Sequence, residues 1–132
     1  MAYLIDTDII IYSLKNNSCV QYNFKRTKNY YKSISVITYA ELKYGANKSS
    51  NYEKNIASLN RISEIFPIIP ISKSIADTFS EVKSILEKKG DVTDDMDLLI
   101  AATALTMNLI LVTNNVKHFN KIKGLKIENW TE

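Results

Sequence analysis

The chain has 132 residues, a length that fits one domain with one core. Hydrophobic residues make up 45% of it and charged residues 23%, which are values of a globular protein and exclude a disordered chain. No apolar run approaches the roughly 20 residues that cross a bilayer, and the first residues lack the pattern of a signal peptide. We therefore expect a cytoplasmic protein without a membrane segment.

Charge and the rare residue types limit the possible chemistry. Lysines and arginines number 17 against 14 aspartates and glutamates, and the net charge of +3 permits a polyanionic partner without requiring one. The single cysteine, Cys19, excludes an internal disulfide and a multi-cysteine zinc site, and we expect it to be a small buried side chain. The single histidine, His118, excludes a histidine-rich metal site, and we expect it at the surface.

Short apolar runs alternate along the chain with longer stretches of helical periodicity. The runs predict strands near 3–5, 33–36, 67–70, 109–112 and 126–128, and the stretches predict helices near 9–14, 19–31, 37–46, 50–65, 72–89 and 94–107. Pro67 and Pro70 indicate that the third strand lies near a sheet edge, and Gly90 ends the fifth helix. This alternation indicates a single α/β domain over residues 1–132, a sandwich with a mainly parallel central sheet flanked by helices.

Asp6 directly follows the first predicted strand and precedes the first predicted helix. A carboxylate between two buried elements must be paired, hydrogen-bonded or bound to a cation. Ligands of parallel α/β sheets bind beyond the carboxyl ends of the strands, which makes Asp6 a candidate site residue. The simpler alternative is that Asp6 only caps the helix, although Thr7 or Asp8 is the cap that we expect.

Glu41 lies within the third predicted helix, on the same face as Ile37, Ala40 and Tyr44. This spacing points the glutamate toward the core or its border, where glutamates are rare. A glutamate at the edge of the apolar stripe, paired with a lysine, is equally compatible with the periodicity.

Three aspartates crowd the start of the last predicted helix, which is apolar almost all round and therefore buried. One aspartate is enough for a cap. Asp97 is closest to the apolar run and should project inward, whereas Asp94 and Asp95 should cap the helix or face solvent. The triplet Thr113-Asn114-Asn115 follows the strand near 109–112, but such a polar turn is a weak signal by itself.

If Asp6, Glu41 and Asp97 converge at the carboxyl edge of the sheet, their mutual repulsion favours a bound cation. Oxygen ligation without histidine or cysteine suits Mg²⁺ or Mn²⁺. Such an ion lowers the pKa of water and neutralises a phosphate, so in a lysine-rich chain it suits phosphodiester hydrolysis.

Five segments of the chain, in order, resemble a PIN-domain ribonuclease of the VapC toxin family. They are Leu4–Tyr12, Ile34–Gly45, Asp97–Ala102, Leu111–Asn115 and Gly124–Trp130. The resemblance implies a PIN-like three-layer fold and a Mg²⁺-dependent endoribonuclease in which Mn²⁺ can substitute. It also implies the toxin of a type II toxin–antitoxin pair, a VapB-like antitoxin, a homodimer, and RNA substrates with tRNA as a candidate.

The resemblance also implies roles for individual residues. Asp6, Glu41 and Asp97 match the catalytic acids of the family, and Asp6 and Asp97 match its metal-binding pair. The fourth catalytic position, aspartate in many PIN domains, is Asn115 here. Asp8 stands where asparagine is usual, so it adds negative charge near the metal unless it only caps the helix.

Two alternatives from other classes are open. A PIN-like module without catalysis would act by binding RNA or a protein, and intact acids at Asp6, Glu41 and Asp97 argue against it. A response-regulator-like domain with an acidic pocket would require a lysine at the end of a late strand, where residues 113–115 have none. The apolar residues of the helices within 37–65 exceed the needs of one core, which also favours a homodimer with helices at its interface.

Overall fold

The computed structural model describes all 132 residues and contains one five-stranded sheet, ordered β3-β2-β1-β4-β5, in which every neighbouring pair is parallel. Its strands are β1 (Ala2–Ile5), β2 (Tyr31–Ser35), β3 (Ile68–Ile69), β4 (Ile110–Val112) and β5 (Ile127–Glu128). The parallel α/β prediction is confirmed, as is the edge position of the strand between the two prolines.

Seven helices surround the sheet: α1 (Thr7–Leu14), α2 (Ser18–Arg26), α3 (Val36–Asn47), α4 (Tyr52–Ile65), α5 (Lys73–Lys88), α6 (Asp95–Met107) and α7 (Val116–Phe119). The sequence predicted all of them except α7, whose four residues are too few to show a period. None of the helices combines the length and the apolar character that crossing a bilayer requires.

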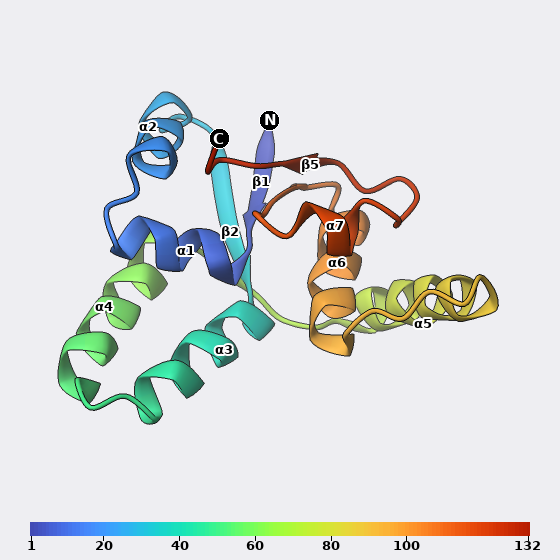
Figure 1. Cartoon of the computed structure of the whole chain (residues 1–132), viewed down its shortest axis with the longest axis horizontal. Coiled ribbons are helices and arrows are strands. Elements are labelled where there is room, and N and C mark those ends of the chain that lie inside the picture. Colours follow the sequence, from blue (N-terminus) through green and yellow to red (C-terminus); the bar gives the residue numbers. More distant parts are fainter.

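Side-chain alternation along the strands builds a core on each face of the sheet. Tyr3 and Ile5 of β1 pack with α1, α2 and α4, whereas Leu4 between them packs with α5, α6 and α7. Figure 1 shows these two groups of helices on opposite sides of β1 and β2. The three-layer arrangement is therefore confirmed.

The strand order places a switch point next to β1. The chain adds β2 and β3 on one side of β1, and then β4 and β5 on the other side. In parallel sheets such a switch opens a crevice at the carboxyl ends of the two strands that flank it. Helices α1, α3 and α6 all begin at this edge (Figure 1), so it collects the residues that start them.

The C-terminal segment is held onto this framework by Trp130, which is 1% exposed. Its ring meets the rings of Tyr3 and Phe24 edge-on, with 5.2 Å between centroids in both pairs. Thr131 then donates a hydrogen bond of 2.9 Å to Oδ1 of Asn114, in the turn after β4. The buried tryptophan thus fixes a segment that supports the edge of the switch point.

Two local predictions were wrong in the second quarter of the chain. The helix expected over residues 19–31 ends at Arg26, because Thr27 turns its hydroxyl back to the carbonyl of Asn23 and residues 31–35 pair with β1 instead. Cys19 is exposed, because it lies on the outer face of α2 whereas Val20 faces the core.

Candidate active site

Asp6 directly follows β1 and caps α1, where Thr7 or Asp8 was expected to be the cap. Its Oδ1 accepts the backbone N–H of Thr7 at 2.8 Å, and its Oδ2 accepts the hydroxyl of Thr113 at 2.7 Å. The register pairs Ile5 with Val112, so the next residues of the two strands are neighbours across the switch point. Asp6 is only 4% exposed, and its cap bond uses just one of its two oxygens.

Glu41 reaches from α3 to the start of α1. Its Oε1 accepts the hydroxyl of Thr7 at 2.6 Å, and that hydroxyl lies 3.1 Å from Oγ1 of the buried Thr38. The glutamate therefore pairs with a threonine, not with a lysine. The apolar stripe expected beside it was wrong: Ala40 is exposed and Tyr44 is 64% exposed, because α3 turns its Thr38–Glu41 face toward α1.

Asp97 occupies the first turn of α6, with its side chain 21% exposed. Asp94 caps the helix by accepting the backbone N–H of Asp97 at 3.3 Å, and Asp95 pairs with Lys83 at 2.9 Å. Asp94 and Asp95 are exposed as expected, and Asp97 is the partly buried member of the three. Asp97 is therefore the aspartate of this turn that can take part in the site.

His118 on α7 lies at the surface as expected, with 63% of its side chain exposed, but its ring also contacts the site. Its Nδ1 is 3.3 Å from Oδ2 of Asp97. The sequence did not reveal this contact, since the only element that places His118 there is the short helix α7.

The carboxylates influence one another through their charges. Burial, and after it the Asp8 carboxylate, raises the pKa of Asp6 to about 7 from the usual 3.8, while hydrogen bonds from Thr113 and Thr7 act in the opposite direction. Burial and then Asp97 likewise raise the pKa of Asp8. Burial also raises the pKa of Asp97, which the hydrogen bond with His118 opposes. Asp6, Asp8 and Asp97 therefore form one negatively charged group at the sheet edge.

Asp8 and the turn after β4 complete this edge. Oδ2 of Asp8 accepts the backbone N–H of Asn114 at 3.0 Å, whereas its Oδ1 is buried without any hydrogen-bond partner. The backbone N–H of Asn115 donates to the hydroxyl of Thr113 at 3.0 Å, but the exposed side chain of Asn115 makes no capping bond and no bond to the acids. The structure thus brings Asp8 into the group and does not bring in the Asn115 amide.

The sequence missed the two threonines that hold the acids. Thr7 binds Glu41, and Thr113 binds Asp6. The signal for Thr113 was its place directly after a buried strand, which becomes informative only when that strand is known to pair with β1.

The oxygen donors at this edge fit a divalent cation. No three His, Cys, Asp or Glu side chains are arranged to hold a metal ion among themselves. Mg²⁺, however, keeps several waters and is usually bound through only one or two carboxylates. A cation would stabilise the ionised forms of Asp6 and Asp97, whose pKa values burial raises before any neighbouring carboxylate does. It would also place a positive charge near the buried Oδ1 of Asp8.

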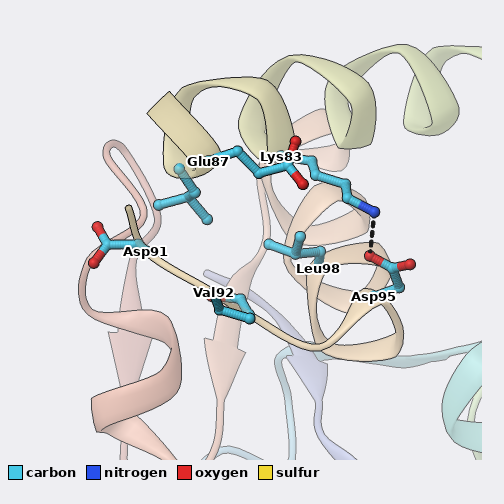
Figure 2. Close-up of a pocket in the computed structure, with 8 residues that line it drawn as sticks. Lys83, Glu87, Asp91, Val92, Asp95 and Leu98 are labelled. Atoms are coloured by element: carbon cyan, nitrogen blue, oxygen red, sulfur yellow. Dashed lines mark hydrogen bonds and ion pairs between the residues drawn. The ribbon is translucent and has the colours of Figure 1, made fainter. Parts of the chain in front are cut away.

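A cavity of about 290 Å³ lies elsewhere, between α5, the loop that follows it and α6. Figure 2 shows the ion pair of Lys83 and Asp95 beside Leu98 on one side of it, with Asp91 and Val92 of the loop on the other. None of Asp6, Glu41 and Asp97 lines this cavity. The acidic group therefore belongs to the sheet edge and not to the cavity.

Comparisons with known proteins agree with this geometry. The family model described as PIN domain matches residues 3–125. Ribonuclease VapC2 of Rickettsia felis is 38% identical over 132 residues, 98% of both chains, and Ribonuclease VapC1 of Haemophilus influenzae strain R2866 is 35% identical over the whole of both chains. The tRNA(fMet)-specific endonuclease VapC of Shigella flexneri is 29% identical over 99% of both.

Solved structures give the same result for the fold. VapBC2 from Rickettsia felis, bound to a DNA fragment from its promoter, superposes with a TM-score of 0.93 at 37% identity, covering 98% of this chain and 99% of the other. VapBC-1 from nontypeable Haemophilus influenzae gives a TM-score of 0.90 at 34% identity over all of both chains.

Acids at the carboxyl edge of a parallel sheet, with a family match along almost the whole chain, define a PIN-domain nuclease. Within that class, the full-length relatives above 30% identity show that the chain belongs to the VapC ribonuclease family. The resemblance found from the five sequence segments is confirmed.

Proposed function

We propose that the chain is a divalent-metal-dependent endoribonuclease that acts in the cytoplasm as the toxin of a type II toxin–antitoxin pair. The observation that carries the catalytic part is the group of carboxylates at the switch point, where burial and then neighbouring carboxylates raise the pKa values of Asp6 and Asp8. Mg²⁺ is the cofactor that we propose, with Mn²⁺ able to replace it, because all the available donors are oxygens.

We assign Asp6 and Asp97 to hold the cation. When bound, it supplies positive charge for the scissile phosphate and lowers the pKa of water. Thr113 fixes one oxygen of Asp6. Glu41, held by Thr7, can accept a hydrogen bond from the attacking water and so orient it in line with the phosphate.

The products that we expect are a 5′ phosphate and a 3′ hydroxyl. The other common route to RNA cleavage uses the 2′-hydroxyl, leaves a cyclic phosphate, and usually requires a base and an acid near neutral pKa, typically two histidines. The chain has only His118. Mapping the product ends with and without EDTA tests the assignment, since cleavage that survives EDTA or leaves 2′,3′-cyclic phosphate would contradict it.

Substitution of Asp6 tests the same site. Asp6→Asn should lower cleavage about 100-fold or more, because the cation would lose a charged ligand that stabilises the transition state. The matched control is Asp77→Asn on α5, which removes one carboxylate from an exposed ion pair with Lys73. Wild-type cleavage by Asp6→Asn would contradict the role of Asp6. Absence of cleavage by the wild-type chain with Mn²⁺ would favour the alternative of a PIN-like module that only binds RNA or a protein.

The RNA target that we propose to test first is tRNA. The support is the Shigella flexneri relative, a tRNA(fMet)-specific endonuclease that is 29% identical to this chain. Sequencing of RNA 5′ ends after induced expression would identify the cut. A cut confined to other RNAs would remove tRNA as the substrate and leave the nuclease assignment intact.

We propose a VapB-like protein as the antitoxin, since the structural relatives are VapBC proteins. A mostly apolar cavity of about 290 Å³ suits an apolar segment of such a partner. It lies between α1, α2 and α4, and its lining includes Leu14, which is 49% exposed, and Ile65, which is 68% exposed. Large exposed apolar side chains of this kind favour a binding surface.

We also propose an isologous homodimer with helices at its interface. Tyr44 on α3 is 64% exposed and Tyr52 on α4 is 44% exposed, so both helices present large side chains outward. The chain has a mass of 15.1 kDa. A light-scattering mass near that of one chain at high micromolar concentration would contradict the dimer.

A further inference from the structure

Asp8 has an unusual environment for a carboxylate. Its Oδ1 is buried and has no hydrogen-bond partner, while its Oδ2 is held by the backbone N–H of Asn114. Burying an oxygen of an ionised carboxylate without a donor or a cation is unfavourable. The folded chain therefore places no hydrogen-bond donor on this oxygen of Asp8.

The charges around Asp8 increase this cost. The ion pairs of the structure join Arg26 with Glu128, Lys73 with Asp77, Lys83 with Asp95 and His118 with Asp97, so none of them includes Asp8. The charge that acts on Asp8 comes from the Asp97 carboxylate, and those that act on the neighbouring Asp6 come from Asp8 and Asp97. No cationic side chain therefore pairs with Asp8, and within the protein only hydrogen bonds, with Asn114 first, act to lower its pKa.

The residue at the fourth catalytic position of the family cannot supply that charge. Asn115 is neutral, and its side chain is exposed and makes no bond to the acids. Asp8 lies on the other side of the same crevice, bonded to the residue immediately before Asn115. A carboxylate is thus present at this edge, but on α1 instead of in the turn after β4.

We propose that the negative charge of Asp8, which acts on the metal-binding Asp6, strengthens the binding of a divalent cation in place of an acid at residue 115. This inference rests on the proposed metal-dependent function. It assigns Asp8 a role in cation affinity, in addition to the support that it gives to the Asn114 turn.

Titration calorimetry of the full chain with Mn²⁺ alone tests this role. Asp8→Asn keeps an oxygen that can accept the Asn114 N–H but removes the charge, so Mn²⁺ should bind about tenfold more weakly than to the wild-type chain. Asp77→Asn, with the same change of charge on the exposed surface of α5, should bind Mn²⁺ within about twofold of wild type. The melting temperature without metal should stay equal or rise in Asp8→Asn, because an unpartnered buried charge is removed.

The outcomes separate this inference from the proposed function. If Asp6→Asn weakens Mn²⁺ binding but Asp8→Asn does not, the metal site stands and the role of Asp8 is overturned. If the wild-type chain binds no Mn²⁺ at millimolar concentration, the metal site itself fails, and the inference fails with it. If Asp8→Asn does not fold, Asp8→Ser, whose hydroxyl can still accept from Asn114, replaces it. Unfolding of both variants would make Asp8 a structural residue and overturn the proposal.

Discussion

The hydroxyl of Thr113 donates a 2.7 Å hydrogen bond to Oδ2 of Asp6, joining the ends of two neighbouring strands whose residues lie 107 positions apart. Thr113 is completely buried and Asp6 nearly so. The bond fixes the direction of one carboxylate oxygen while the cap of α1 fixes the other. Asp6 therefore has a defined orientation before any ligand arrives.

Loss of the Thr113 hydroxyl should affect both stability and cleavage. Thr113→Val keeps the shape but leaves Oδ2 of Asp6 without its donor, so we expect unfolding to become easier by about 1–3 kcal/mol. Cleavage should fall about tenfold or more, because Asp6 loses its fixed orientation. Urea unfolding and an RNA cleavage assay measure the two effects.

Thr103→Val is the control for this substitution. Thr103 is equally buried, but its hydroxyl bonds only to the carbonyl of Leu99 within α6. Its replacement should leave cleavage by the folded chain near the wild-type rate. Equal losses of cleavage in the two variants would show that the Thr113–Asp6 bond has no special role.

The stability of the metal-free chain should fall as the pH rises from about 4 to about 7. The folded pKa of Asp6 is about 7 and its ordinary value is 3.8, so within this window the folded chain keeps a proton that the unfolded chain has lost. Ionising Asp6 therefore costs stability, up to about 4 kcal/mol above pH 7. Urea unfolding in EDTA at pH 5 and pH 7.5 measures the difference.

Two comparisons test whether Asp6 causes this fall of stability with pH. Asp6→Asn should reduce the pH dependence of stability, because the amide does not titrate in this range, while Asp8 and Asp97, whose pKa values are also raised, retain part of it. Mn²⁺ should restore stability mainly at the higher pH, where Asp6 is ionised. A slope of the same size in wild type and Asp6→Asn would assign the pH dependence to other groups.

His118→Ala should change cleavage by less than about fivefold at saturating Mg²⁺. The pair with Asp97 is exposed on the histidine side, and exposed ion pairs contribute about 1 kcal/mol or less. Initial cleavage rates of wild type and His118→Ala measure the effect. A cleavage rate lowered about 100-fold or more would instead indicate that His118 acts as an acid or base, because a loss of that size is expected for a catalytic group.

Ile65→Asp should weaken binding of the antitoxin while leaving RNA cleavage unchanged. Ile65 is 68% exposed and lines the apolar cavity between α1, α2 and α4, where a buried aspartate would oppose an apolar partner. Ile85→Asp on α5 is the control, since Ile85 is 54% exposed and lies outside that cavity. Co-purification with the antitoxin and inhibition of cleavage are the measurements, and equal binding by both variants would place the antitoxin elsewhere.

Much of the fold could be predicted because local patterns are strong where elements are buried. The apolar run at 109–112 and the two prolines around β3 identified a central and an edge strand without any tertiary information. The hydrophobic pattern misled the prediction where it was weak. The polar segment after Arg26 was predicted as helix but leads into β2, which pairs with β1, and α7 was too short to detect. Tertiary pairing overrides local propensity in such segments.

The sequence by itself determined the parallel α/β class, the family, and Asp6, Glu41 and Asp97 as candidate acids, because buried runs and the carboxylates that interrupt them are local properties of the chain. Only the tertiary structure decided how those acids are held. The register of Ile5 with Val112 brings the turn after β4 against the start of α1, where Thr113 meets Asp6 and Asn114 meets Asp8. These partners are more than 100 positions apart, and strand pairing over such a distance depends on the packing of the whole sheet, which no local pattern contains.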